Sequence, residues 1–268
     1  MVRLIKPLTP RKRFGQNFLV DASVALEFCH RLRLQSSDNL IEIGAGYGSL
    51  TQYLLPIVKR MQAIELDHDV IPHLHLQCDS LGELTVHQAD ALHFDFSSIM
   101  RDKPTRIIGN LPYNISTPLL FHLLKYLDNI QDMHFMLQYE VVLRMAAKPN
   151  SAAYGRLSVM LQYFCEIEQL FQVPPTAFKP IPKVNSAVVC LRPHSMISKP
   201  VQDFQIFTAV VREAFNLRRK TLRNSLKTYL DYPDWQRLGI NPQLRAENLS
   251  VADYVSIADY VKDSNNSG

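Results

Sequence analysis

The chain has 268 residues, of which 47% are hydrophobic and 20% charged, and this composition is typical of a globular protein with a sizeable core. Its formal net charge of +4 permits an anionic partner without requiring one. No apolar run reaches the roughly 20 residues that span a bilayer, and no secretory signal stands out, so we expect a cytoplasmic protein with no membrane partner.

The first two thirds of the chain alternate predicted helices and strands. Asp21 is placed to cap a helix that runs to Leu32, and Ser116 is placed to cap a later one. Strands are predicted at 39–43, 61–66, 84–87, 106–108 and 133–138, and helices at 50–59, 69–81 and 116–127, with Pro56 disturbing the first of these helices. This alternation predicts an α/β fold, in which helices cover both faces of a mostly parallel sheet.

The remaining third changes character near residues 194–200. Before this point we expect a helix at 153–164 and strands at 168–173 and 186–192, joined by the proline-rich loop 174–182. Beyond it, strand patterns end and Phe204, Phe207, Val211 and Phe215 recur at helical spacing. The sequence therefore predicts two domains, residues 1–194 and residues 195–268, of which the second is all-helical.

A glycine loop follows the strand at 39–43. Gly44, Gly46 and Gly48 allow a tight turn and a close approach of the backbone to a ligand. Glu65 ends the next strand, at the position from which an acidic side chain accepts hydrogen bonds from a ribose. The dinucleotide pattern requires its third small residue one position later, at Ser49, so the loop favours S-adenosyl-L-methionine over NAD.

Two further motifs lie where later strands end. Asp90 is placed to accept a hydrogen bond from the adenine amine of the cofactor. The residues after the strand at 106–108 read Asn110, Leu111, Pro112 and Tyr113. Pro112 restricts Leu111, so the Asn110 amide and the Leu111 carbonyl can accept from one exocyclic amino group while Tyr113 stacks on its base. An ordinary turn is the alternative, and the ordered set of motifs disfavours it.

Cysteine spacing gives no sign of a metal site. The four cysteines are widely separated and no histidines accompany them at ligand spacing, so we expect reduced core side chains and no bound metal.

Taken together, these motifs resemble those of the KsgA-type ribosomal RNA adenine dimethyltransferases, and the resemblance covers nearly the whole chain. Residues 11–19 are similar to the N-terminal signature of this family, in which the residues matching Asn17 and Leu19 close over the cofactor. Residues 42–48 match its glycine motif, although Ala45 stands where many members carry proline. The resemblance implies a Rossmann-like S-adenosylmethionine-dependent methyltransferase sheet, within residues 1–194, and a smaller all-α C-terminal domain that recognises RNA or the ribosome.

The resemblance also implies roles for individual residues. Phe178 matches an aromatic residue near the target base, although a core phenylalanine is the alternative. The implied catalytic set is Asn110, Leu111, Pro112, Tyr113 and Phe178. The implied cofactor-binding set is Asn17, Leu19, Gly44, Gly46, Glu65, Asp90 and Asn110.

Basic residues are concentrated in two segments, residues 11–13 and residues 201–230, and we expect both segments to bind RNA. Between positions 201 and 230 six basic residues stand against two acidic ones, although a solvated helix face would also explain them. Residues 215–226 resemble the C-terminal signature of the bacterial members. The predicted RNA-binding residues are Arg11, Lys12, Arg13, Arg218, Arg219, Lys220 and Arg223.

The activity implied is transfer of methyl groups to N6 of two adjacent adenosines in the 3′-terminal hairpin loop of small-subunit (16S) rRNA. The partner would be this rRNA within an assembling 30S particle, and the enzyme would act as a monomer. One alternative is a resistance methyltransferase of large-subunit rRNA, which the bacterial-type tail disfavours. Another is a non-catalytic, transcription-factor-like relative, which Glu65 and the intact motif at 110–113 disfavour.

Overall fold

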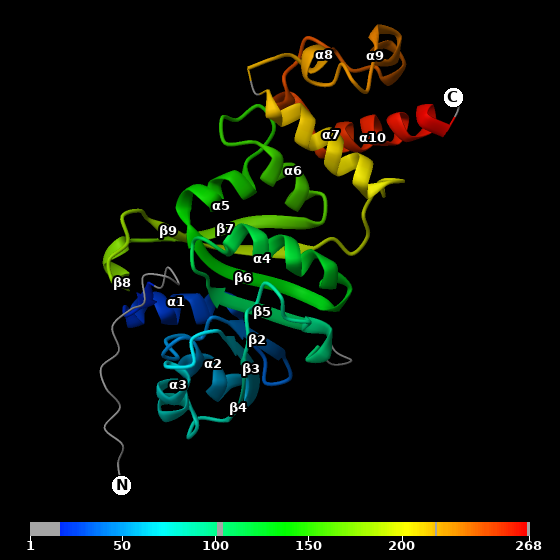
Figure 1. Ribbon diagram of the computed structural model, residues 1–268. Helices are drawn as coiled ribbons and strands as arrows, with labels where there is room; N and C mark the ends of the chain where they lie inside the picture. The colour runs from blue at the N-terminus through cyan, green and yellow to red at the C-terminus, as the bar shows by residue number, and fades with distance from the viewer. Residues whose placement is uncertain (1–16, 101–103, 218, 267–268) are drawn as a thin grey trace. The chain divides into compact units, whose positions relative to one another are not determined.

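The computed structural model describes residues 17–100, 104–217 and 219–266 (Figure 1). Packing divides the chain into two compact units. The first unit ends at Val142 and resumes over Glu168–Pro193, and the second comprises Leu143–Ile167 and the described residues from His194 onward. The chain passes from the first unit to the second for the last time between Pro193 and His194, one residue before the predicted boundary between residues 194 and 195. The segment Leu143–Ile167, which the predicted boundaries place in the first domain, packs with the second unit.

The first unit is built on a mixed seven-stranded sheet of order β4-β3-β2-β5-β6-β9-β7. The neighbouring pairs from β4 to β6 are parallel, and β9 pairs antiparallel with β6. The strands are β2 (Asn39–Ile43), β3 (Arg60–Glu65), β4 (Glu83–Gln88), β5 (Thr105–Asn110), β6 (Ile130–Gln138), β7 (Cys165–Val173) and β9 (Ser186–Pro193). The α/β prediction is confirmed.

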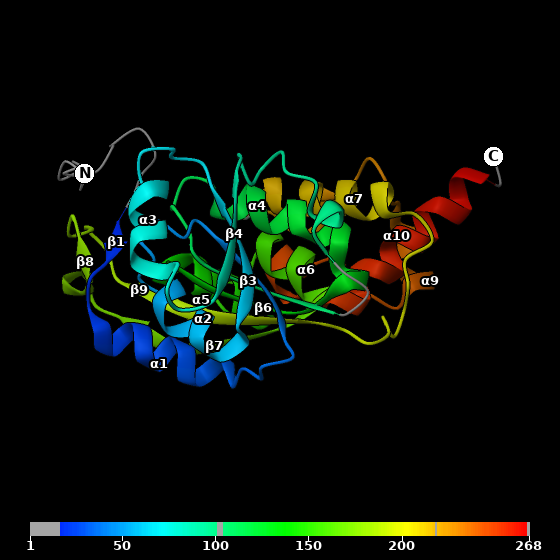
Figure 2. The same ribbon diagram turned by 90° about the horizontal axis from the view of Figure 1, so that it is seen from below.

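Helices cover both faces of this sheet. Buried residues of α1 (Ala22–Leu32), α2 (Thr51–Val58) and α3 (Ile71–Cys78) form one core cluster with alternate residues of the strands. Figure 2 shows α1 and α4 (Ser116–Leu123) on opposite sides of the sheet. The intervening residues of the strands, such as Ile107, are buried toward the other face. The layered arrangement is therefore dictated by apolar residues on both faces of each central strand.

Two helix starts test the predicted caps. The Asp21 carboxylate accepts hydrogen bonds from the backbone N–H groups of Ser23, at 2.9 Å, and Val24, at 3.4 Å, which confirms it as the cap of α1. Ser116 is not a cap: Ile115 holds that position, and the Ser116 hydroxyl donates to the Tyr113 carbonyl at 3.1 Å. The helix α4 ends at Leu123 and continues as the 3₁₀ helix η3 (Leu124–Asn129).

The proline-rich segment contains more structure than a loop. After the 3₁₀ turn η4 (Pro175–Ala177), the short strand β8 (Phe178–Lys179) pairs antiparallel with β1 (Phe18–Leu19). The backbone N–H of Val20 extends this contact by donating to the Ala177 carbonyl at 2.8 Å. The pairing brings the N-terminal signature segment and the proline-rich segment together, although they are far apart in sequence.

The second unit is helical, as predicted from the spacing of its apolar residues. Phe207, Val210, Val211 and Ala214 form the buried face of α7, whose first residue follows the Asp203 cap. The helices are α6 (Arg156–Gln162), α7 (Phe204–Asn216), α8 (Leu222–Ser225), α9 (Tyr232–Leu238) and α10 (Val251–Asn266), and α5 (Tyr139–Ala146) bridges the two units in sequence. Helices of the described segments all fall short of the length and apolar character needed to cross a bilayer.

Candidate cofactor and base-binding site

A cavity of about 980 Å³, its open mouth included, lies at the carboxyl ends of β2, β3 and β5 in the first unit. This is the edge of a parallel sheet at which open α/β folds bind ligands. The predicted site residues that line it are Asn17, Gly44, Gly46, Glu65, Asp90, Asn110, Leu111, Pro112 and Tyr113. The structure thus brings the glycine loop, both acidic residues and the motif after β5 into one cavity.

At Gly46 the glycine loop passes close to the Phe18 ring, and its backbone lies in the left-handed region that favours glycine. Gly46 has a φ of 55°, and a Cβ atom there would lie 3.2 Å from the Phe18 ring. Its backbone N–H points to Glu65 and donates to Oε2 at 2.9 Å. The loop therefore holds the acidic side chain in place as well as leaving room for a ligand.

Glu65 is buried at the end of β3 and fixed by two backbone donors. Besides Gly46, the N–H of Asp67 donates to its Oε1 at 2.9 Å. Burial raises the pKa of the Glu65 carboxyl, and both hydrogen bonds oppose that rise because they favour the charged form. Each carboxylate oxygen keeps a further lone pair, so both ribose hydroxyls of an adenosine can be bound.

Asp90 lies across the cavity on the turn after β4. Its Oδ1 accepts from the Leu92 N–H at 3.0 Å, and its Oδ2 lies 3.2 Å from His93 Nδ1. These bonds orient the carboxylate while its side chain stays 39% exposed, as an acceptor for an adenine amine requires.

The apolar residues that line the cavity were not predicted from the sequence. Leu66 is 46% exposed although it is a large apolar side chain, and it lines the cavity beside Glu65. Phe18, Ala91, Leu92 and Ile115 line the same space. The available signal in the sequence was a large apolar residue directly after Glu65, because ligand pockets are lined mostly by apolar side chains.

The motif after β5 is held from several sides. The Asn110 Nδ2 donates to the Asn17 carbonyl at 3.0 Å, which leaves the acceptor atom Oδ1 for another partner. The Leu111 N–H donates to the Met136 carbonyl of β6 at 3.2 Å. Gly109 cannot be replaced without movement, since a Cβ atom there would lie 2.4 Å from the Ile43 carbonyl. The loop is therefore a preorganised part of the sheet edge.

Two predicted site residues lie elsewhere. Phe178 is 1% exposed, packs in the core cluster and is not among the residues that line the cavity, so its predicted place near the target base stays a prediction. Leu19, opposite Phe178 in the β1–β8 pair, is also in that core. Its neighbour Phe18 lines the cavity instead, because successive side chains of a strand point to opposite sides.

The predicted RNA-binding residues are only partly visible. Arg219, Lys220 and Arg223 are exposed near the start of α8 in the second unit. Arg11, Lys12, Arg13 and Arg218 lie outside the described residues.

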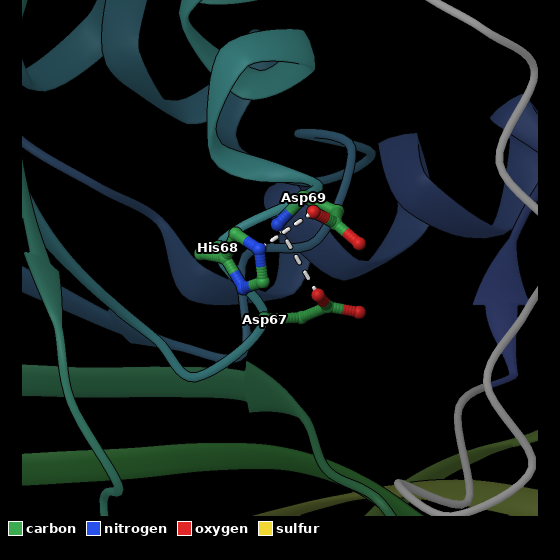
Figure 3. A group of neighbouring side chains, drawn as sticks. All are labelled: Asp67, His68 and Asp69. Carbon is green, nitrogen blue, oxygen red and sulfur yellow. Dashed lines mark hydrogen bonds and ion pairs between the residues drawn. The ribbon is translucent and has the colours of Figure 1, made fainter.

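The four cysteines are free and buried, as predicted. Three consecutive residues after β3 place possible metal-ligating atoms within 4.8 Å of one another (Figure 3). These residues, Asp67, His68 and Asp69, also contact one another. The Asp69 N–H donates to Asp67 Oδ1 at 3.2 Å, and His68 Nε2 lies 2.8 Å from Asp69 Oδ1. The prediction that the protein binds no metal stays a prediction.

Glu42, beneath the glycine loop, gives a pH-dependent prediction. Burial raises the pKa of its carboxyl from 4.5 to about 7, against the hydrogen bond from the Thr51 hydroxyl at 2.6 Å. Between these values the folded state binds more protons than the unfolded state, so the free energy of unfolding falls as the pH rises. We expect Glu42→Gln to remove this loss and to become more stable than the wild type by about 3 kcal/mol at pH 8. Urea unfolding from pH 5 to pH 8 measures it, and a constant difference would contradict it.

The sheet, the glycine loop and the acidic pair around one cavity define a Rossmann-like, S-adenosylmethionine-dependent methyltransferase. The family model described as "Ribosomal RNA adenine dimethylase" matches residues 8–263. The chain therefore belongs to the ribosomal RNA adenine dimethylase family.

Individual relatives agree with this assignment. The chain is 52% identical over 254 residues to the ribosomal RNA small subunit methyltransferase A of Marinobacter nauticus, covering 95% of this chain and 92% of the relative. It is 51% identical to the protein of the same name from Nitrosospira multiformis, covering 94% and 96%. Among solved structures, a dimethyladenosine transferase from Plasmodium falciparum superposes with a TM-score of 0.78 at 25% identity, covering 90% and 95%. The 23S rRNA methyltransferase ErmE, at 20% identity and a TM-score of 0.73, shares the fold.

Proposed function

We propose that this enzyme transfers methyl groups from S-adenosylmethionine to N6 of two adjacent adenosines in the 3′-terminal hairpin loop of small-subunit rRNA. The observation that carries the proposal is the position of Asn110, which lines the cofactor cavity with its Nδ2 bonded to Asn17 and its Oδ1 available. The names of the similar bacterial proteins, which are small-subunit methyltransferases, support the choice of rRNA.

The residues that line the cavity suit S-adenosylmethionine. Glu65 would hold the ribose of the cofactor and Asp90 its adenine amine, and Phe18 and Leu66 would contact its apolar surfaces. S-adenosylmethionine, when bound, supplies an electrophilic methyl group on a sulfonium.

The amine of adenine is a poor nucleophile because its lone pair is delocalised into the ring. In our proposal, Asn110 Oδ1 and the Leu111 carbonyl would accept its two hydrogens, so that the nitrogen would become pyramidal and its lone pair would be available to form the new bond to carbon. The cofactor's sulfur would keep the electron pair of the broken S–CH3 bond, and the nitrogen would lose one proton to water. The same acceptors stabilise the positive charge that develops on the nitrogen. Tyr113 stacks on the base and holds it at this position.

The adenosine must leave its stack to reach the cavity, which costs least in a loop. We propose that Arg219, Lys220 and Arg223 contact the RNA backbone, together with Arg218 and the basic N-terminal residues. The substrate would be met within an assembling 30S particle in the cytoplasm, and the enzyme would act as a monomer.

Labelled S-adenosylmethionine, incubated with small-subunit particles that lack the modification, tests the proposal. We expect label in two adjacent adenosines of the 3′-terminal hairpin, identified as dimethyladenosine by nuclease mapping. A parallel incubation uses unmodified large-subunit rRNA, and label there with none in the small-subunit particles would support the resistance-type alternative. RNA binding without transfer would support a non-catalytic role.

Neutralising Arg219, Lys220 and Arg223 together is expected to weaken binding of the particle at moderate salt. If all three contact phosphates, the slope of log binding constant against log salt should become shallower by about 2 to 3. Filter binding at several salt concentrations measures the slope. Neutralising the exposed Lys125, on η3 of the first unit, is the control, and an unchanged slope in the triple variant would place RNA elsewhere.

A further inference from the structure

The phenol of Tyr113 has a hydrogen-bond partner that was not predicted from the sequence. Its hydroxyl lies 2.8 Å from the Ser186 hydroxyl, at the first residue of β9. Tyr113 lines the cavity and is half-buried, whereas Ser186 is buried, so the bond joins the cavity wall to the interior of the sheet. Burial raises the pKa of the Tyr113 phenol, which is therefore protonated at neutral pH and can donate this bond.

Ser186 is itself fixed by the sheet. It stands opposite Gln138 in the antiparallel pair of β6 and β9. The neighbouring Asn185 carbonyl accepts from the Tyr139 N–H at 2.9 Å. A hydroxyl attached to a paired strand has little freedom, so it is a rigid anchor for a mobile partner.

Tyr113 is thus held at both ends. The Ser116 hydroxyl donates to its backbone carbonyl, and Ser186 holds the far end of its side chain. Without the second contact, the ring would be free to turn about its Cα–Cβ and Cβ–Cγ bonds, because Tyr113 lines the cavity and is only half-buried. The position of the ring determines where a stacked base lies relative to Asn110.

We infer that Ser186 is a positioning residue for methyl transfer, which fixes the Tyr113 ring so that the exocyclic amine meets its acceptors. The inference rests on the proposed function, in which Tyr113 stacks on the target adenine. It also gives the segment 178–186 a part in the site. Phe178 is buried in the core, but the same segment leads into β9 and places the buried Ser186 behind the cavity wall, in contact with Tyr113.

A double-mutant cycle tests this inference with full-length protein. Ser186→Ala and Tyr113→Phe each remove one hydroxyl, and each is expected to lower kcat by about tenfold, since small misplacements of a reacting group are costly. The KM for S-adenosylmethionine should stay within about twofold, because neither hydroxyl is assigned to the cofactor. The double variant should lose no more than the worse single variant, since both remove the same bond. Ser186→Thr, which keeps the hydroxyl, should recover most of the rate.

Thr105→Val is the matched control. The Thr105 hydroxyl is also buried and accepts from Asn39 Nδ2 at 2.8 Å, but it lies at the other end of β5 from the cavity. Its loss should leave kcat unchanged, and thermal unfolding of all variants separates misfolding from mispositioning. If Ser186→Ala does not fold, Tyr113→Phe tests the same hydrogen bond, because it removes the hydroxyl of the half-buried partner.

The outcomes distinguish a failure of the positioning role of Ser186 from a failure of the proposed methyl-transfer function. A wild-type protein that transfers no methyl group to unmodified particles would overturn the proposed function. Wild-type transfer together with an unimpaired Ser186→Ala, or with losses that multiply in the double variant, would overturn the positioning role alone.

Discussion

Replacing Asn110 with alanine is expected to lower methyl transfer by about 10³-fold while cofactor binding stays measurable. The side chain supplies an acceptor at the atom where positive charge develops, and removal of one such group typically costs 10² to 10³ in rate. The variant also loses the bond to the Asn17 carbonyl, which loosens one wall of the cavity. We therefore expect a weaker effect, of a few fold, on the dissociation constant of S-adenosylmethionine.

Asn110→Asp separates these two contributions. Aspartate keeps an acceptor oxygen but loses the Nδ2 donor, so it should retain much more activity than alanine if the acceptor matters for chemistry. Single-turnover transfer to unmodified particles measures the rate, and equilibrium dialysis measures the cofactor. A rate for Asn110→Ala within tenfold of the wild type would contradict the proposed role.

Replacing Glu65 with alanine is expected to weaken binding of S-adenosylmethionine by about 100-fold or more. The variant loses the two acceptors proposed for the ribose, and it leaves the buried N–H groups of Gly46 and Asp67 without their partner. Each unsatisfied buried donor costs about 1–3 kcal/mol, so the thermal unfolding midpoint should also fall. Glycine-loop order and cofactor affinity thus depend on one carboxylate.

Glu83→Ala is the control for Glu65. Glu83 is exposed at the opposite end of the same part of the sheet and pairs with Arg60 at 2.8 Å. Exposed pairs contribute little, so this variant should bind the cofactor and unfold as the wild type does. Calorimetric titration of both variants gives the comparison, and equal affinities would exclude Glu65 from the cofactor site.

The features that could be predicted from the sequence are those that depend on residues close together in the chain. The Asp21 cap followed from a side chain two residues from its donor, and the glycine loop followed from residues adjacent in sequence. The cap assigned to Ser116 was wrong because its hydroxyl is engaged by the Tyr113 carbonyl on the preceding turn. A propensity cannot show which of two nearby partners a hydroxyl takes.

Contacts between distant segments could not be predicted in this way. Phe178 matched a family position, yet its side chain points into the core because of the pairing of β8 with β1. Tyr113 and Ser186 are 73 residues apart, and only the antiparallel return of β9 beside β6 brings them together. The packing of Leu143–Ile167 with the second unit likewise depends on tertiary contacts, which a boundary drawn along the sequence misses.

The bond between Asn110 and the Asn17 carbonyl bridges 93 positions and ties the reacting loop to the first described residue of the chain. The loop that we propose to be catalytic is therefore expected to depend on the presence of Asn17. A shortened protein that starts after Val20 would keep Glu65, Asp90 and the whole sheet, yet it would lose a wall of the cavity and the restraint on Asn110. Comparisons of rate between shortened proteins should therefore use variants that all keep Asn17.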